Sequence, residues 1–229
     1  MAPRSRRRCP TICTMIITNF KTYLSATAEN AIKLAKIHQQ VSEDLGADIR
    51  IAVQAVDLFR VTEAVNIPVF AQHIDPIGFG SHTGFILPEA VKSVGAEGTI
   101  LNHSEHRLDR ETLQRAIERC KEVGLTTVVC AETPEEGASF LEFDPDYIAV
   151  EPPELIGGEI SVSSAKPEII ENAAKLIGSE KLLVGAGVKN GKDVRIAIKL
   201  GARGVLLASG ITKAKDPKAA LMDLASGLV

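Results

Sequence analysis

The sequence predicts an α/β fold in which eight parallel strands, each followed by a helical segment, close into a single (β/α)8 barrel. Short runs of aliphatic and β-branched residues alternate with longer segments of helical periodicity along the chain. Most of the short runs are continuously apolar, as strands of a parallel sheet are when both of its faces are covered. Eight such repeats within 229 residues fit the size of one barrel.

The predicted strands are short apolar runs that end in polar or glycine-rich segments. Their β-branched and aliphatic residues are typical of buried strands. Trp is absent and aromatic residues make up 4% of the chain, so the core is expected to be aliphatic. In chain order, the predicted strands are Met15–Asn19, Ile49–Gln54, Val69–Gln72, Gly98–Asn102, Thr126–Cys130, Tyr147–Val150, Lys181–Val184 and Gly204–Leu207.

The predicted helices lie between these strands and show the usual signals of helix ends. Gly124, Gly178 and Gly201 each follow the last periodic residue, as a glycine just beyond a helix does. Asp216 is expected to cap the last helix, with Pro217 at its first position. The predicted helices are Thr27–Leu45, Arg110–Val123, Lys166–Ile177, Asn190–Leu200 and Pro217–Leu224.

An open, doubly wound sheet is the other fold that accepts repeated strand–helix units. No G-x-G-x-x-G sequence follows the first predicted strand, so the dinucleotide-binding form of that fold loses its main support. The number of repeats and the chain length favour the closed barrel. Neither a linker nor a low-complexity segment interrupts residues 15–229, which we expect to form one domain.

Charge, hydropathy and cysteine content argue against several classes of protein. The net charge of −3 does not suit general binding to nucleic acid or to an anionic membrane. No apolar run approaches the roughly 18–20 residues of a membrane-spanning helix. The four cysteines (Cys9, Cys13, Cys120 and Cys130) lack the spacing of a zinc site and are few for a disulfide-stabilised scaffold. They indicate a reducing, cytoplasmic setting.

Residues 1–14 differ from the rest of the chain. They contain four arginines and no acidic residue, and no long apolar segment follows them as it would in a secretory signal. A basic targeting tail is one interpretation. The interpretation that we favour is a disordered basic extension upstream of Met15, which would then be the natural start of the protein.

Residues able to carry out chemistry follow the predicted strands at their carboxyl ends, where barrels of this type have their active sites. The first strand leads into Lys21, the fourth into His103 and the sixth into Glu151. Small residues at 185–187 and 208–210 follow the last two strands, so main-chain N–H groups can approach a phosphate there. A carboxylate base, a hydrogen-bond donor and an ammonium group suit proton abstraction next to a carbonyl.

Seven short segments carry a resemblance to a known family. They are NFKTY (19–23), AQHID (71–75), SHTGF (81–85), LNHSEHR (101–107), VEPPELIGG (150–158), VGAG (184–187) and LLASGITKAKDP (206–217). Their order and spacing over residues 15–229 resemble the triosephosphate isomerase family, in the shorter form typical of archaea, and together they are highly specific. The resemblance implies a TIM barrel with 15–229 as its catalytic domain. It also implies reversible isomerisation of dihydroxyacetone phosphate and D-glyceraldehyde 3-phosphate through an enediol(ate), in glycolysis and gluconeogenesis.

The resemblance implies catalytic roles for four residues. Glu151 would be the base that moves a proton between C1 and C2 of the triose. His103 would be a neutral imidazole that donates a hydrogen bond to the enediolate, with its pKa lowered by a helix N-terminus. Lys21 would attract the phosphate and stabilise charge on the carbonyl oxygen, and Asn19 would orient both the substrate and Lys21.

Two further residues match family motifs, and only Glu105 is treated as a second-rank site residue. Glu105 resembles an acid of the same motif and is expected to hold the geometry by pairing with Lys21 or Arg107. Cys130 resembles a cysteine that ends the fifth strand, and we interpret it as a packing residue. For the catalytic candidates the simpler interpretations are structural: a capping acid, a core histidine or a solvated lysine. Their positions at strand ends, within the family motifs, favour function.

The substrate phosphate is expected to lie against main-chain groups, as the resemblance implies. Residues 152–158 would form a lid that closes over the triose. Relatives often read IGTG where this chain has Gly158 and Glu159, which predicts a looser hinge and weaker phosphate affinity. No metal or organic cofactor is implied, because acid–base and electrostatic groups suffice. The residues expected to bind substrate and phosphate are Asn19, Lys21, Ile156, Gly157, Gly187, Ala208 and Ser209.

The segment SHTGF (81–85) resembles the protruding third loop that family members insert into a neighbouring subunit. The implied partners are therefore the triose phosphate substrate and a second copy of the chain, in a homodimer or a homotetramer. His82 and Thr83 would lie near the interface.

Two other functions are compatible with parts of the sequence. Another phosphate-binding barrel, such as an isomerase or synthase of aromatic amino-acid biosynthesis, would share the glycine-rich turns but not NFK, NHSE and EPPELIG together. A non-catalytic relative could serve as a binding or scaffold protein, but the presence of Lys21, His103 and Glu151 argues against it. A coupled assay with glyceraldehyde 3-phosphate separates the three.

Overall fold

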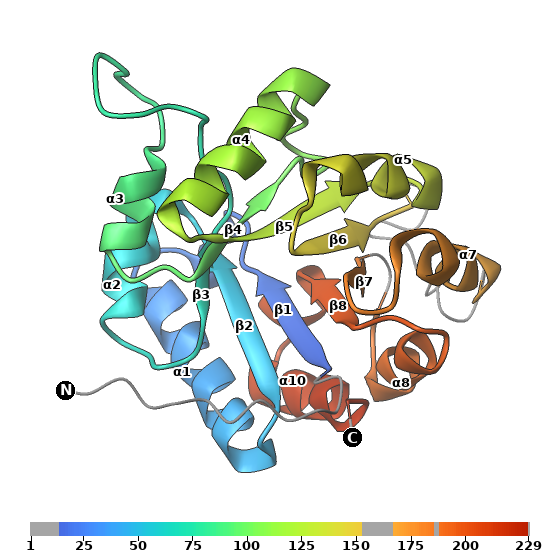
Figure 1. The fold of residues 1–229 in the computed structure, drawn as a ribbon. Coiled ribbons are helices and arrows are strands. Elements are labelled where there is room, and N and C mark those ends of the chain that lie inside the picture. The colour runs from blue at the N-terminus through green and yellow to red at the C-terminus, as the bar shows by residue number, and fades with distance from the viewer. Residues whose placement is uncertain (1–13, 153–166, 186–187, 229) are drawn as a thin grey trace.

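The strands form a closed barrel with helices around it (Figure 1). The computed structural model describes residues 14–152, 167–185 and 188–228. Each strand pairs in parallel with the next one in the chain, and β8 (Gly204–Leu207) pairs with β1 (Met15–Asn19) to close the barrel. The predicted (β/α)8 barrel is therefore confirmed, and the open sheet is excluded.

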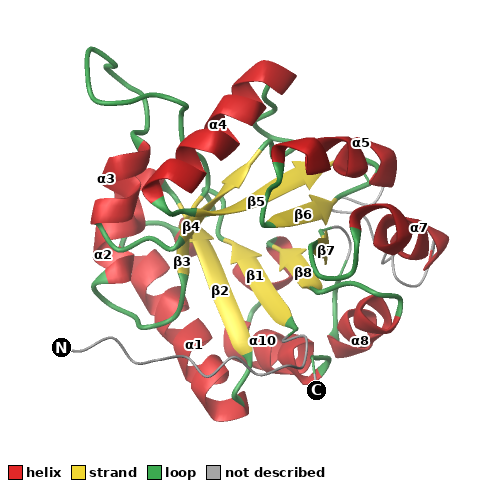
Figure 2. Ribbon diagram, viewed as in Figure 1, coloured by secondary structure: helices red, strands yellow, loops and turns green. Residues whose placement is uncertain are grey.

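Helices cover the outside of the barrel and strands line its inside (Figure 2). Among the described residues, no helix is both long enough and apolar enough to cross a membrane. The other strands are β2 (Asp48–Val53), β3 (Val69–Ala71), β4 (Gly98–Leu101), β5 (Thr126–Ala131), β6 (Tyr147–Val150) and β7 (Leu182–Val184). The α-helices are α1 (Glu29–Leu45), α2 (Leu58–Thr62), α3 (Pro88–Ser93), α4 (Arg110–Val123), α5 (Pro134–Ser139), α7 (Pro167–Ile177), α8 (Gly191–Lys199), α9 (Ser209–Thr212) and α10 (Pro217–Ser226). Short 3-10 helices are η1 (Leu24–Ala26), η2 (Ala55–Asp57) and η3 (Phe140–Phe143).

The predicted boundaries differ from these by one or two residues. β1, β6, β8 and α4 span the predicted residues. The helix predicted from Thr27 begins at Glu29, because Ala28 has a left-handed φ of 54° and stays outside the first turn. Smaller corrections are Asp48–Val53 for Ile49–Gln54, Val69–Ala71 for Val69–Gln72, Gly98–Leu101 for Gly98–Asn102, Thr126–Ala131 for Thr126–Cys130, Leu182–Val184 for Lys181–Val184, Gly191–Lys199 for Asn190–Leu200, and Pro217–Ser226 for Pro217–Leu224.

The predicted helix-end residues act as expected. Gly124 ends α4 with a left-handed φ of 74°, a conformation that glycine adopts without steric cost. The Asp216 side chain accepts a hydrogen bond from the Ala219 N–H at 3.0 Å, and Pro217 occupies the first turn of α10. These ends fix where each helix returns the chain to the barrel.

Two apolar layers hold the barrel together. Successive side chains of a strand point to opposite faces, so each strand contributes to both layers. Outward-pointing residues such as Ile16 pack with residues of the helices, including Leu34 of α1. The inner layer fills the barrel, and its rigid packing gives fixed positions to the residues at the strand ends. The inner residues are Met15, Ile17, Ala52, Phe70, Ile100, Val128, Cys130, Ala149, Leu183 and Leu206.

His38 joins α1 to β1 inside the outer layer. Its fully buried ring has Nδ1 at 2.8 Å from the Leu34 carbonyl oxygen and Nε2 at 3.0 Å from Thr18 Oγ1. A carbonyl oxygen accepts hydrogen bonds, so Nδ1 carries the proton and Nε2 accepts from the Thr18 hydroxyl. Burial lowers the pKa of His38 to about 4, against the opposing effect of the bond to Leu34. The ring is therefore neutral in the folded protein.

Because the pKa of His38 in the folded state is below its usual 6.5, the stability that this group contributes is present above pH 6.5 and lost as the pH falls towards 4. Linkage gives a loss of about 2 kcal/mol between about pH 7 and about pH 5. His38→Gln cannot take up this proton. Between about pH 7 and about pH 5, its free energy of unfolding should therefore decrease by about 2 kcal/mol less than that of the wild type. Urea unfolding of both proteins at the two pH values measures the difference, and equal decreases would contradict it.

Candidate active site

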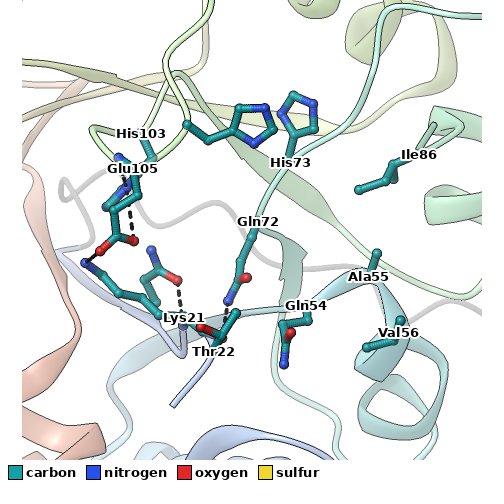
Figure 3. A pocket seen from close by; sticks show the side chains of 12 residues that line it. Lys21, Thr22, Gln54, Ala55, Val56, Gln72, His73, Ile86, His103 and Glu105 are labelled. Atoms are coloured by element: carbon teal, nitrogen blue, oxygen red, sulfur yellow. Dashed lines mark hydrogen bonds and ion pairs between the residues drawn. The ribbon is translucent and has the colours of Figure 1, made fainter. Parts of the chain in front are cut away.

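The candidate residues that the structure describes gather at the carboxyl ends of the strands. A cavity of about 360 Å³ opens there between the segments that follow β1 to β4. Lys21, Gln72, His103 and Glu105 line it (Figure 3). Residues that are far apart in the sequence therefore face one space, as the barrel topology predicted.

Lys21 is held at the rim in an uncommon backbone conformation. Its φ of 47° lies in the left-handed region, which residues other than glycine rarely adopt. The Lys21 N–H donates to Asn19 Oδ1 at 3.0 Å, and Gln72 Nε2 donates to the Lys21 carbonyl at 3.0 Å (Figure 3). Both bonds hold the turn that brings the lysine side chain from the end of β1 to the cavity.

Glu105 is the ion-pair partner of Lys21. The Lys21 ammonium lies 2.8 Å from Glu105 Oε1, whereas Arg107 pairs with Glu136 of α5. Of the two partners suggested by the sequence, Lys21 is therefore the one that Glu105 takes. The Glu105 side chain is 60% exposed, so the pair is open to solvent, and an anionic ligand can compete for the ammonium.

His103 presents a neutral imidazole with a defined tautomer. The Glu105 N–H donates to His103 Nδ1 at 3.1 Å, so the proton of the neutral ring is on Nε2. Burial, and after it the positive charge of Lys21, lower the pKa of His103 to about 4, against the opposing effect of Glu105. We expected a helix N-terminus to have this effect, but α4 begins only at Arg110. Burial replaces the helix as the main cause.

Glu151, directly after β6, carries a carboxylate that is almost completely buried. It is 7% exposed, and Oε2 has no hydrogen-bond partner within the described residues. Burial raises the pKa of Glu151 to about 7, although a hydrogen bond from Cys130 and the charge of Lys21 both lower it. Oε2 lies 3.7 Å from His103 Nε2. A poised base thus stands opposite a hydrogen-bond donor.

Gly185, directly after β7, leaves room for that carboxylate. A Cβ atom at this position would lie 2.3 Å from Glu151 Cγ, much closer than any van der Waals contact. The Gly185 N–H also donates to the Val150 carbonyl at 3.0 Å, which ties the end of β7 to the end of β6. The glycine was grouped with the phosphate-binding turn in the sequence, but its described contacts are with the base.

The expected phosphate-binding residues are described in part. Ala208 precedes the short helix α9 and Ser209 begins it, so the first N–H groups of α9 lie at the end of β8. Asn19 and Lys21 lie at the cavity, as given above. Ile156, Gly157, Gly158, Glu159 and Gly187, and with them the part of the expected lid beyond Pro152, lie outside the described residues.

Two contributors, Gln72 and Cys130, were not recognised in the sequence as parts of the active site, and a third, Gly185, was assigned to the phosphate-binding turn instead. Gln72 belongs to the segment AQHID, and its position just after β3 places it on the rim of the cavity. Cys130 packs inside the barrel, as predicted, and its thiol also lowers the pKa of the Glu151 carboxyl group. Gly185 makes the close approach to the base. For Gln72 the available signal was its position at a strand end, and for the other two it was the pairing of β5, β6 and β7.

The arrangement can move a proton beside a carbonyl group. A carboxyl group with a pKa near neutrality can accept and return a proton, the imidazole Nε2–H can donate to a developing oxyanion, and the ammonium can attract negative charge. Within the part of the chain that the structure describes, no three His, Cys, Asp or Glu side chains are grouped as metal ligands would be.

Comparison with known proteins gives one consistent family. The family model described as triosephosphate isomerase matches residues 14–226. The triosephosphate isomerase of Methanobacterium bryantii is 49% identical over 216 residues, which cover 93% of this chain and 96% of the relative. That of Methanothermus fervidus is 49% identical over 92% of this chain and 96% of its own. That of Methanocaldococcus jannaschii is 48% identical over 92% of this chain and 98% of its own.

Gly185→Ala tests the packing around Glu151. The added methyl group must displace the carboxylate, and a misplacement of about 1 Å lowers turnover by about 100-fold. Steady-state turnover of glyceraldehyde 3-phosphate, the substrate that the resemblance implies, measures the effect. Gly137→Ala is the matched control, because its Cβ would crowd Ile148 and Ile177 at 2.9 Å beneath α5. It should lower the melting temperature and leave kcat unchanged. Equal kcat in the two variants would refute the inference that Gly185 sets the position of the Glu151 carboxylate.

Proposed function

The chain belongs to the triosephosphate isomerase family, and from this membership we propose how its residues divide the work of catalysis. The protein catalyses the reversible interconversion of dihydroxyacetone phosphate and D-glyceraldehyde 3-phosphate, a step of glycolysis. The proposal concerns the roles of Glu151, His103, Lys21 and Asn19. The observation that carries it is the 3.7 Å separation of Glu151 Oε2 and His103 Nε2 in a buried setting beside Lys21.

Glu151 is the base. It removes a proton from one of the two carbons, C1 or C2, and returns it to the other. A carboxylate in water has a pKa near 4 and is a weak base, whereas burial raises the pKa of Glu151 to about 7 and makes proton transfer in both directions accessible near neutral pH. This symmetry suits a reaction that runs both ways.

His103 is the electrophile. Its Nε2–H donates to the substrate oxygen on which charge develops, and it remains a neutral donor because its pKa is about 4. A neutral histidine in this role is the established arrangement in the family. The main-chain bond from Glu105 to Nδ1 supports the assignment, because it leaves the ring proton on the nitrogen nearest Glu151.

Lys21 supplies the positive charge. Its ammonium attracts the substrate phosphate and stabilises the enediolate, and Asn19 holds the Lys21 main chain in place. Substrate binding draws the ammonium away from the exposed Glu105, a step made easy by the small strength of exposed ion pairs. Main-chain N–H groups at Ala208 and Ser209, together with Ile156, Gly157 and Gly187, complete the phosphate site. The segment 152–158 acts as the lid that keeps water from the enediolate.

We assign residues 15–229 as one catalytic domain and the cytoplasm as its compartment. Cys120 and Cys130 support a reducing compartment, since both are free thiols buried in the protein. The reaction then serves gluconeogenesis as well as glycolysis, because the same residues work in either direction.

Glu151→Asp tests the base. The carboxylate withdraws by about one methylene group, so kcat should fall by about 100-fold or more. In the wild type, kcat/KM should fall about tenfold per pH unit below about pH 7, because the base is protonated there. His103 should not contribute to this limb, because it stays neutral at pH values well above 4. Glu142→Asp, on the exposed surface, is the control and should behave as the wild type. Full activity in Glu151→Asp would remove Glu151 as the base.

We also propose that the protein works as a homodimer or homotetramer through its third loop. Residues 75–86 project from the barrel between β3 and α3 (Figure 1). Asp75 and Ile86 bond to each other at the neck of this loop, through Asp75 N to Ile86 O at 2.9 Å and Ile86 N to Asp75 Oδ2 at 2.6 Å. Phe79 and Phe85 are 80% and 56% exposed. A projecting, closed loop with exposed aromatic rings fits insertion into a second subunit.

The double substitution Phe79→Ser, Phe85→Ser tests this interface. Burial of two phenylalanine side chains contributes about 3 kcal/mol or more, so the dissociation constant should rise at least about 100-fold. Light scattering at micromolar concentration should show an oligomer for the wild type and a monomer for the variant. Met222→Ser, at an exposed apolar residue of α10, is the control and should leave the oligomer intact. A wild-type monomer would contradict the proposal.

A further inference from the structure

Asn102 links the two sides of the catalytic pair. It follows β4 directly, precedes His103 in the chain and is 2% exposed. Its φ of 59° is left-handed, a conformation that costs a non-glycine residue about 1 kcal/mol or more. Asparagine tolerates this conformation better than most residues do, but a buried, strained polar residue still needs contacts that retain it.

Both ends of the Asn102 side chain are hydrogen-bonded. Nδ2 donates to the Cys130 carbonyl at 2.9 Å, and Oδ1 accepts from the Leu108 N–H at 2.9 Å. The first bond reaches the neighbouring strand, and the second closes the segment 103–108 into a loop. One amide group thus holds β5 and the loop that begins with His103.

The bond to Cys130 extends the pairing of β4 with β5 by one step. The register of the two strands ends at the pair Leu101–Val129. Asn102 then turns into the left-handed region, and its side-chain amide donates to the carbonyl of the next residue on β5. β4 can therefore end at Leu101, where the loop begins, while the Asn102 side chain still ties the chain to β5.

Both segments held by Asn102 contact one of the two residues of the catalytic pair. The loop 103–108 carries the Glu105 N–H that sets the His103 tautomer. On the other side, Cys130 points into the barrel beside the Glu151 carboxylate, close enough for its thiol to lower the pKa of that group. The side-chain bonds of Asn102 therefore connect the segment that carries the imidazole to the residue that contacts the base.

We propose that Asn102 is a positioning residue, which holds His103 in its Nε2–H tautomer and fixes its separation from Glu151. The inference rests on the proposed roles of these two residues. Glycine would allow the same backbone conformation without either bond, so a glycine variant separates the effect of the side chain from that of the turn.

Asn102→Gly is the direct test, because it keeps the left-handed turn accessible and removes both bonds. We expect kcat to fall at least about tenfold with KM changed by less than about threefold, since the loss falls on the transition state. In ¹⁵N spectra of histidine-labelled protein, the wild-type His103 ring should show one neutral tautomer and the variant a mixture. The His103 signal is assigned with His103→Gln.

Asp144→Gly is the matched control. It also replaces a left-handed polar residue, with φ of 52° and hydrogen bonds from Lys121 and Lys181, but it lies before β6 at the opposite end of the barrel. It should keep wild-type kcat and the wild-type His103 spectrum. Wild-type kcat together with one His103 tautomer in Asn102→Gly would overturn the proposal, as would an equal loss of kcat in Asp144→Gly.

Asn102→Asp keeps the inference testable if the glycine variant does not fold. It preserves the shape and the oxygen that accepts from Leu108, and it replaces the donor to Cys130 by a second oxygen. At alkaline pH, where this carboxylate is ionised, kcat should again fall at least about tenfold, and wild-type kcat would overturn the proposal. The roles on which the inference rests are tested separately. Full activity in Glu151→Asp refutes the base, whereas a steep loss there with full activity in the Asn102 variants refutes the positioning role alone.

Discussion

The burial of one carboxyl group, that of Glu151, is the constraint on which the catalytic end of the barrel depends. Removal from water disfavours the ionised form, and this raises the pKa of Glu151 to about 7. A second anion in direct contact would raise the pKa further and leave the carboxyl group protonated at neutral pH. Among the described residues, the neighbours of Glu151 include a neutral imidazole and a neutral thiol, and the positive charge of Lys21 lowers the pKa of the carboxyl group. The thiol of Cys130 is kept neutral because its own burial, and then the charge of Glu151, raise its pKa.

A buried carboxylate in the proposed role of a base also has to be held rigidly, and the barrel supplies this rigidity. Lys21 and Asn102 both follow a strand and both have left-handed φ values, so the chain leaves β1 and β4 through turns that are unfavourable on their own. Each turn is retained by side-chain bonds to a neighbouring segment, from Gln72 in one case and to Cys130 in the other. Backbone strain at the rim can persist only because the strands beneath it are packed on both faces.

The sequence predicted the architecture almost completely and the active site in part. Continuous apolar strands, terminal glycines and the repeat number were sufficient for the barrel, because each is a local consequence of burial on two faces. The proposed roles of Lys21, His103 and Glu151 rest on their positions at strand ends and on family resemblance. The cause of the low His103 pKa did not follow, because desolvation depends on every segment that covers the ring. The preference of Glu105 for Lys21 over Arg107 did not follow either, because Arg107 is taken by Glu136 of α5.

Some of the missed contacts were nevertheless contained in the barrel prediction. In a barrel whose strands pair in chain order, the residues after β6 must meet those after β5 and β7. The register places Val150 beside both Ala131 and Val184, so Glu151 had to lie near Cys130 and Gly185. Alternation along β6 directs Ala149 into the barrel, Val150 outward and Glu151 inward again, which points the carboxylate at the inward-facing Cys130. Strand order and side-chain alternation therefore predict which residues surround a catalytic group. The tautomer of His103 could not be predicted in this way. It depends on the main-chain N–H of Glu105 in an irregular loop, and the hydrophobic periodicity of the sequence does not specify the conformation of such a loop.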